Sequence, residues 1–277
     1  MMPSAEPGCG SRVGEGWSTV TAHTQVPGDV ADFGHKLADL VAGSSDGHLV
    51  GAYLHGSAAL GGWVATRSDV DILIVLRDPL AGATLTAVEQ VLAEHGPGSP
   101  GTGLECSVVT LAQAANPSAP WPFLAHVQAS HGKAPVRVLG DSVAGDRDVL
   151  MHYVVCRSAG FALVGPDPRE VFGSVPRAVV LAYLVDELRW GIANAPAAYA
   201  VLNACRALIF ASRGDLVSKI AGGRIAVDSR LGPVSTISSA LDQQRALSEP
   251  RPITPEATAF VERAIRTLDF RALRPGG

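Results

Sequence analysis

The most constraining feature of this chain is the segment HGSAALGGWVATRSDVDILIVL, which begins at His55. It joins a Gly-Ser step, Gly56 and Ser57, to a pair of aspartates, Asp69 and Asp71, at the head of an apolar run. A nearly continuous run of β-branched and aliphatic residues predicts a buried strand. Because side chains two positions apart on a strand point to the same face, we expect the two carboxylates to lie side by side.

The chemistry of these residues points to phosphate. Two adjacent carboxylates repel each other unless a cation lies between them, and Mg²⁺ prefers such oxygen ligands. The Gly-Ser step follows a second strand-like run, Leu49–Leu54. Glycine lets backbone N–H groups approach a ligand closely, and a serine hydroxyl can hydrogen-bond a phosphate. These residues predict phosphoryl or nucleotidyl transfer. The alternative is that they have no catalytic role and form a βαβ turn, in which the two aspartates cap a helix or face solvent.

The order of these motifs resembles the nucleotidyltransferase superfamily of the DNA polymerase β type. Its signature is Gly-Ser, a short helical segment and then Asp-x-Asp on a strand. Here the offset from Gly56 to Asp69 is 69 − 56 = 13 positions, which suits one short helix and a turn. The resemblance implies an α+β catalytic domain with a small mixed sheet, in which Gly56 and Ser57 bind nucleotide phosphates.

Composition limits the possible partners. The chain has 277 residues, enough for two domains, and 47% of them are hydrophobic. A net charge of −4 argues against a nucleic-acid partner and favours a small acceptor. No apolar run approaches the 18 or so residues of a membrane span. The four cysteines are far apart, which predicts free thiols in a reducing cytoplasm and no zinc site.

The pattern along the chain predicts two domains after a leader. We expect a disordered leader over residues 1–27, a catalytic domain over 28–147 and an all-α helical bundle over 148–277 that closes the active-site cleft. Strand patterns should be absent from residue 148 onward. The strands expected are Leu49–Leu54, Asp69–Leu76, Leu104–Leu111 and an edge strand within Lys133–Leu139. The helices expected after residue 148 are Val149–Ala159, Pro176–Ile192, Ala197–Ser212, Ser235–Leu247 and Pro255–Leu273.

Glu105 opens the strand expected to lie beside Asp69 and Asp71. A carboxylate there could take the proton of an attacking hydroxyl or bind a metal, and by itself it could equally be an exposed strand glutamate. Further phrases make the chain similar to the aminoglycoside nucleotidyltransferases that adenylylate streptomycin and spectinomycin. These phrases are YLHGSA, GG, SDVDILIV, LECSVV, PW and ALVGP. The resemblance implies that Glu105 is the catalytic base, and that the reaction uses ATP and Mg²⁺.

The same family uses an arginine and a lysine of its helical domain on the nucleotide phosphates. Arg206, in VLNACRALIF, and Lys219, in LVSKIA, stand at the matching places. The resemblance therefore implies that both bind phosphate, where their positive charge would stabilise the transferring group. Without the resemblance, a snorkelling or ion-paired arginine and a solvated lysine are the simpler interpretations.

The expected acceptor site departs from the family. Trp190 matches a tryptophan that holds the drug, but the following segment, Gly191–Ala200, contains no acidic residue where the family has aspartates. Asp186 and Glu187, one turn earlier, are possible substitutes, or they belong to a solvated helix face. Without these aspartates, the guanidinium groups of streptomycin would have no acidic partners in this segment. We therefore expect a compact spectinomycin-like acceptor rather than streptomycin.

Together these features predict a monomeric adenylyltransferase that modifies a hydroxyl of a small molecule, with a role in antibiotic resistance. Two alternatives stay open. The enzyme could nucleotidylate another natural product or a protein hydroxyl, or the chain could be a catalytically silent, nucleotide-binding regulator.

Overall fold

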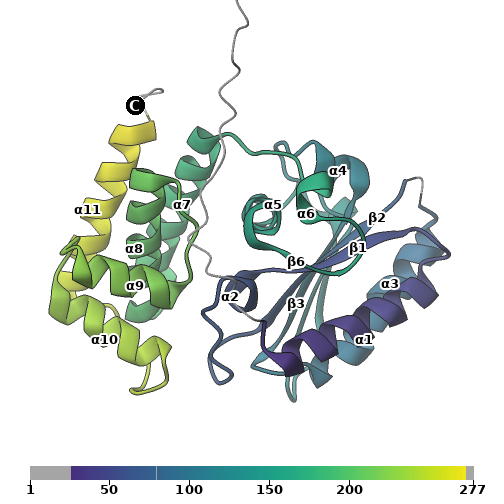
Figure 1. The fold of residues 1–277 in the computed structure, drawn as a ribbon, viewed down its shortest axis with the longest axis horizontal. Helices are drawn as coiled ribbons and strands as arrows, with labels where there is room; N and C mark the ends of the chain where they lie inside the picture. The colour runs from purple at the N-terminus through teal and green to yellow at the C-terminus, as the bar shows by residue number, and fades with distance from the viewer. Residues whose placement is uncertain (1–25, 79, 273–277) are drawn as a thin grey trace, which may run out of the picture.

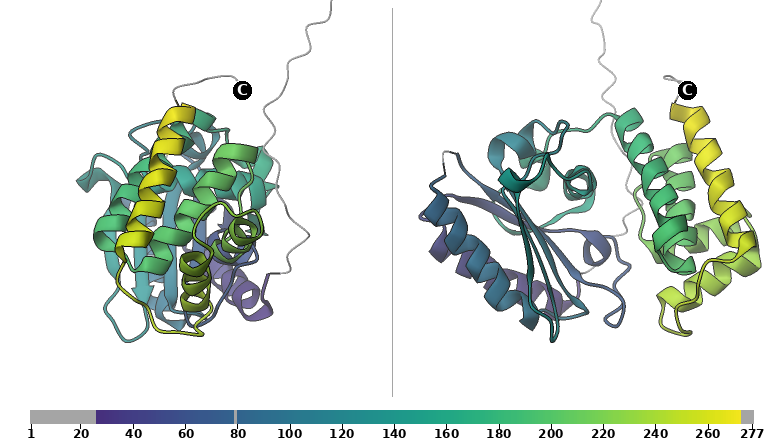
Figure 2. Two further views of the ribbon diagram at one scale, coloured as in Figure 1. Left: turned by 90° about the vertical axis from the view of Figure 1, so that its left-hand side faces the viewer. Right: turned by 180° about the vertical axis from the view of Figure 1, so that it is seen from behind.

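The computed structural model describes residues 26–78 and 80–272. The chain forms a mixed six-stranded sheet flanked by helices, followed by a region made of helices alone (Figure 1). Figure 2 shows the two regions side by side from behind in its right view, whereas in its left view the helical region lies in front of the sheet. The predicted fold class is therefore confirmed, whereas most of the predicted leader lies outside the described residues.

The sheet has the strand order β5-β4-β3-β2-β1-β6. Only β2 and β3 run parallel, and the other neighbours are antiparallel. The central pair, β2 and β3, carries the acidic residues singled out in the sequence. The bounds are β1 (Leu49–Leu54), β2 (Val70–Leu76), β3 (Gly103–Thr110), β4 (Ala125–Ser130), β5 (Val136–Leu139) and β6 (Phe161–Val164).

Helices cover both faces of the sheet, which explains the continuous apolar run of β2. Ile72 and Ile74 pack toward α1 and α3, while Leu73 and Val75 pack toward α5 on the other face. A strand buried on both faces needs apolar residues at every position rather than at alternate ones. These helices are α1 (Gly28–Ser44), α2 (Gly56–Ala59), α3 (Gly82–His95), α4 (Leu111–Ala115), α5 (Asp148–Ala159) and α6 (Pro168–Val171), with short 3₁₀ helices at Gly96–Gly98 and Gly140–Ser142.

The helical region is built around α8 (Ala197–Arg213), which packs against α7, α9, α10 and α11. Most residues of α8 are buried, because it has neighbours on several sides. It ends at Gly214, whose positive φ of 78° suits a glycine C-cap. The other helices are α7 (Arg177–Asn194), α9 (Lys219–Asp228), α10 (Val234–Gln244) and α11 (Pro255–Ala272).

The expectation that strands end before residue 148 is wrong, because β6 pairs with β1 at the edge of the sheet. β6 has only four residues, and Leu163 is the only one of them that is buried, so it leaves no periodic signal. β4 and α9 were also missed; the buried residues of α9 are the small Gly222, Gly223 and Ala226. Since α5, β6 and α6 lie with the sheet, we propose a domain boundary after α6.

Three cysteines, Cys106, Cys156 and Cys205, are free and buried as predicted. Cys9 lies outside the described residues. Across residues 26–78 and 80–272, no helix is both long enough and apolar enough to cross a membrane.

Candidate active site

The three acidic residues predicted from the sequence lie together. Asp71 on β2 is paired with Glu105 on β3 in the parallel register, and Asp69 lies just before β2. One carboxylate oxygen from each residue lies within 4.8 Å of the others. The two neighbouring strands thus bring three carboxylates to one edge of the sheet.

This cluster is electrostatically unfavourable without a cation. Burial, followed by the charges of Asp69 and Glu105, raises the pKa of Asp71 well above its usual range. Burial and the charge of Asp69 raise the pKa of Glu105 to about 7. Converging oxygen ligands that repel one another are the donor set that a hard divalent cation prefers, so the residues present fit Mg²⁺.

The Gly-Ser step begins α2, which follows β1 after His55, and residues 55–57 are called the Gly-Ser turn. The His55 N–H donates to the Asp71 carbonyl at 3.0 Å, which ties the turn to β2. Gly56 has a φ of 59°, and a Cβ atom there would overlap the Asp71 carboxylate. Ser57 donates its N–H to Asp71, while its hydroxyl is buried and has no hydrogen-bond partner among the described residues. The turn therefore leaves the Ser57 hydroxyl free for a ligand.

Arg206 and Lys219 lie in the cavity that contains this turn. The cavity has a volume of about 290 Å³, and Ser57, Asp69 and Glu105 also line it. Arg206 is held in place by its Nε, which donates to the Val217 carbonyl at 2.8 Å. Burial lowers the pKa of both cationic groups. The structure thus brings the predicted phosphate-binding cations together with the Gly-Ser turn and the acidic cluster.

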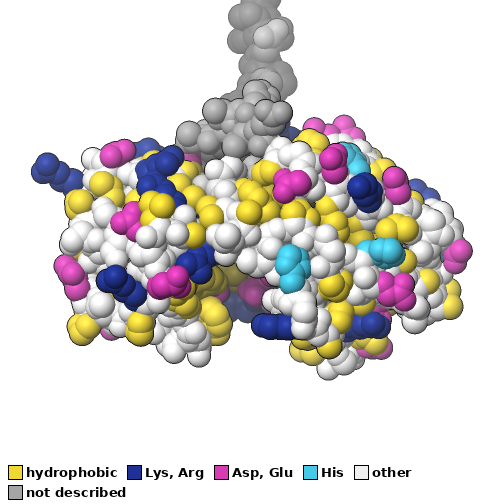
Figure 3. Space-filling model, turned by 90° about the horizontal axis from the view of Figure 1, so that it is seen from below, with side chains coloured by type: hydrophobic (Ala, Val, Ile, Leu, Met, Phe, Trp, Pro, Cys, Tyr) yellow, Lys and Arg dark blue, Asp and Glu magenta, His cyan; other side chains and the backbone are white. Residues whose placement is uncertain are grey.

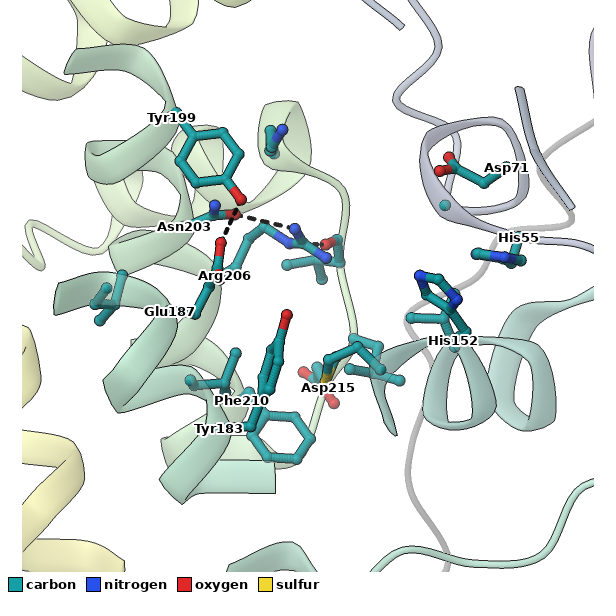
Figure 4. A pocket seen from close by; sticks show the side chains of 18 residues that line it. His55, Asp71, His152, Tyr183, Glu187, Tyr199, Asn203, Arg206, Phe210 and Asp215 are labelled. Carbon is teal, nitrogen blue, oxygen red and sulfur yellow. Dashed lines mark hydrogen bonds between the residues drawn. The ribbon is translucent and has the colours of Figure 1, made fainter. Parts of the chain in front are cut away.

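A second cavity, of about 190 Å³, lies between the sheet and the helical region. Figure 4 shows His55, Asp71 and His152 on one side of it, facing Tyr183 and Arg206 of α7 and α8 on the other. In the space-filling view of Figure 3, a hollow containing both acidic and basic side chains separates the two regions. The candidate site is therefore formed by both regions.

The two histidines of this cavity were not predicted. The Nε2 atom of His152 lies 3.8 Å from Oε1 of Glu105, and its ring lies 4.7 Å from that of His55. Burial lowers the pKa of both rings, that of His152 to about 4, so both are neutral at pH 7. No motif signals His152, because α4, β4 and β5 separate α5 from β3 along the chain.

Trp190 lies at the rim of a third cavity, of about 270 Å³, which Glu187 and Tyr199 also line. Its side chain is 51% exposed and packs edge to face with the ring of Tyr199, with 5.7 Å between centroids. The same Tyr199 ring also contacts Lys219, whose Nζ lies 4.6 Å from the ring centroid. Tyr199, missed in the sequence, thus connects the candidate phosphate and acceptor cavities.

The two acids proposed beside Trp190 differ in their availability. Asp186 pairs with Arg147 and, at 3.2 Å, with Arg189, and the hydrogen bond from Arg147 lowers its pKa. Glu187 accepts a hydrogen bond from the Tyr199 hydroxyl, and burial raises its pKa. Asp186 is therefore already neutralised by arginines, whereas Glu187 has no cationic partner at ion-pair distance among the described residues.

A further acid that lines this cavity, Asp148 at the start of α5, was not among the predicted site residues. Its carboxylate accepts a hydrogen bond from the Tyr183 hydroxyl at 2.8 Å. Burial raises its pKa. The cavity beside Trp190 therefore contains acids even though Gly191–Ala200 has none.

Comparison with solved structures finds the spectinomycin adenyltransferase AAD(9) from Enterococcus faecialis, determined with ATP and spectinomycin. The two chains superpose with a TM-score of 0.60 and 18% identity, over 83% of this chain and 96% of the other. At this identity the likeness establishes a shared fold, the mixed sheet followed by helices. No protein-family model matches the sequence, and a comparison with curated proteins finds no match.

Proposed function

We propose that this protein is an ATP- and Mg²⁺-dependent nucleotidyltransferase that adenylylates a hydroxyl of a small acceptor. The observation that carries the proposal is the juxtaposition of the three carboxylates with the Gly-Ser turn and two partly buried cations. The shared fold with an adenyltransferase solved with ATP supports the same chemistry.

The residues of the first cavity have complementary roles toward a nucleoside triphosphate. Ser57 has a free buried hydroxyl for a phosphate oxygen, and Arg206 and Lys219 supply positive charge where negative charge develops. Asp69, Asp71 and Glu105 would hold the divalent cation, which when bound neutralises charge on the phosphate oxygens.

Glu105 is the proposed general base. Its carboxylate takes the proton of the acceptor hydroxyl while the acceptor oxygen bonds to the α-phosphorus. The bond from that phosphorus to the bridging oxygen of the β-phosphate breaks, and pyrophosphate leaves with the electron pair. This role is supported by the position of the Glu105 carboxylate, which lies beside those of Asp69 and Asp71 at the start of the neighbouring strand.

The acceptor would bind against Trp190 and Tyr199, where aromatic surface can pack on a compact ring system. Asp148 and Glu187 could each bind a basic or hydroxyl group. Each carboxylate already accepts a hydrogen bond from a tyrosine hydroxyl, Asp148 from Tyr183 and Glu187 from Tyr199, so this wall compensates the desolvation of two guanidinium groups poorly. A spectinomycin-like acceptor therefore fits better than streptomycin. Spectinomycin is the acceptor bound in the structural neighbour.

The test is pyrophosphate release from ATP and Mg²⁺ across a panel of aminocyclitols and aminoglycosides. We expect release with at least one compact aminocyclitol, and Glu105→Gln should lower turnover by roughly 10²–10⁴-fold while ATP binding changes little. Wild-type turnover in Glu105→Gln would show that this residue is not the base. A wild-type protein that binds ATP but releases no pyrophosphate with any acceptor would favour a nucleotide-binding regulator.

A further inference from the structure

Arg67 is a third cation in the proposed nucleotide cavity, and it comes from the sheet region rather than the helical one. It lies two residues before Asp69, in the turn that leads into β2. It lines the cavity together with Ser57, Arg206 and Lys219. The cavity therefore has cations on walls contributed by both regions.

The guanidinium group of Arg67 is only partly satisfied. Its Nη2 donates to the Ser248 carbonyl, just after α10, at 3.4 Å. Its Nε is buried and has no hydrogen-bond partner in the part of the chain that the structure describes. No carboxylate among those residues forms an ion pair with it. A partly buried, unpaired guanidinium in a polar cavity is suited to bind an anion with two oxygens.

The position of Arg67 along the cavity indicates which anionic group of a ligand it would bind. Asp71 and Glu105 are paired across β2 and β3, and the chain runs back from Asp71 through Asp69 to Arg67. The turn is held by Thr102, whose N–H donates to the Ser68 carbonyl at 2.8 Å. Because Ser68 is held beside Thr102, which precedes Glu105 by three residues, the backbone of Arg67 lies beyond that of Asp69 as seen from the proposed base.

We propose that Arg67 binds the terminal phosphate of the nucleotide and so distinguishes a triphosphate from a diphosphate. The α-phosphate must lie near Glu105, where the acceptor is deprotonated, and the remaining phosphates extend away from it. Because Arg67 also bonds the Ser248 carbonyl, a terminal phosphate held there would be in contact with both regions. This role requires that the cavity binds a nucleotide, so the inference rests on the proposed function.

The experiment is calorimetric binding of ATP, ADP and AMP in the presence of Mg²⁺ to the full-length protein. Arg67→Gln should weaken ATP binding by about 10–100-fold and leave ADP and AMP binding within about threefold of wild type. Arg67→Lys keeps the charge but not the forked geometry and should give an intermediate loss. The matched control is Arg245→Gln, since Arg245 also has a buried, unpartnered Nε but is not among the residues lining this cavity.

The outcomes separate the two proposals. A wild-type protein that binds none of the three nucleotides would contradict the proposed function itself. Wild-type binding of ATP that Arg67→Gln leaves unchanged, or an equal loss for ATP, ADP and AMP, would overturn the role of Arg67 alone. Thermal melting of each variant without nucleotide checks that it is folded. If Arg67→Gln is unfolded, the ratio of ATP affinity to ADP affinity is measured in Arg67→Lys instead, and a ratio equal to that of wild type would overturn the role of Arg67.

Discussion

Asp71 illustrates how a single residue can be costly for folding and necessary for the proposed reaction. Its carboxylate lies beside those of Asp69 and Glu105, and its pKa is raised well above the usual range. When the pKa of a carboxyl group is higher in the folded state than in the unfolded state, its ionisation opposes folding. In the absence of a bound cation, we therefore expect Asp71 to lower the stability of the folded protein at neutral pH.

We predict that Asp71→Asn abolishes transfer yet raises the melting temperature of the metal-free protein at pH 8 by at least about 2 °C. The difference from wild type should shrink as the pH falls below the folded-state pKa of Asp71, because the wild-type carboxyl is then protonated. Scanning calorimetry across pH, with and without Mg²⁺ and ATP, measures both effects. Activity above a tenth of wild type in Asp71→Asn, or in Asp69→Asn, would contradict the metal assignment.

At the scale of elements, the Gly-Ser turn at the start of α2 positions the phosphate-binding groups. α2 has only four residues, so it contributes little stability of its own, and its place depends on the bond from the His55 N–H to β2. The close approach of Gly56 to Asp71 brings the Ser57 hydroxyl and the acidic cluster into one cavity. Glycine is required because the turn combines a positive φ with a contact that excludes a Cβ atom.

Gly56→Ala should therefore weaken ATP binding by more than about 100-fold, because the turn must move away from Asp71 to avoid overlap. Calorimetric titration with ATP and Mg²⁺ gives the affinity. Gly28→Ala is a suitable control, since Gly28 lies at the start of α1 and a Cβ atom there would have open space around it. Equal ATP affinity in Gly56→Ala and wild type would mean that the turn does not bind phosphate.

At the scale of the whole molecule, the acceptor wall depends on contacts between the two regions. Tyr183 of α7 donates to Asp148 of α5, and Arg147 pairs with Asp186. These contacts bring Asp148 of the sheet region into the same cavity as Trp190 of the helical region. The acceptor cavity therefore exists only when the two regions are docked against each other.

We predict that spectinomycin binds the complex with ATP and Mg²⁺ more tightly than streptomycin does, and that Trp190→Ala weakens spectinomycin binding by about tenfold or more through the loss of aromatic packing. Calorimetry with both drugs measures this preference. Trp63→Ala, a substitution away from the acceptor wall, serves as the control. Tight streptomycin binding that Trp190→Ala does not affect would show that this assignment of the acceptor wall is wrong.

The local features of the site could be predicted from the sequence, because each depends on residues close together in the chain. The apolar run of β2 specifies a doubly buried strand, and the period of two places Asp69 and Asp71 on one face. The short offset from Gly56 to Asp69 allows one helix and a turn. The alternating pattern after Leu104 likewise predicts the strand that carries Glu105. Side-chain period and chain geometry are sufficient for these conclusions.

Only the tertiary structure decided the contacts that join distant parts of the chain. β6 is too short and too exposed to be recognised before β1 pairs with it. The approach of His152 to Glu105 and the bond from Arg67 to Ser248 each connect segments that follow different elements. No local pattern encodes such a neighbour, because its position depends on how the helices dock on the sheet and on each other. The acidic cluster is therefore a property of two adjacent strands, whereas the walls that would select nucleotide and acceptor arise from the packing of the two regions.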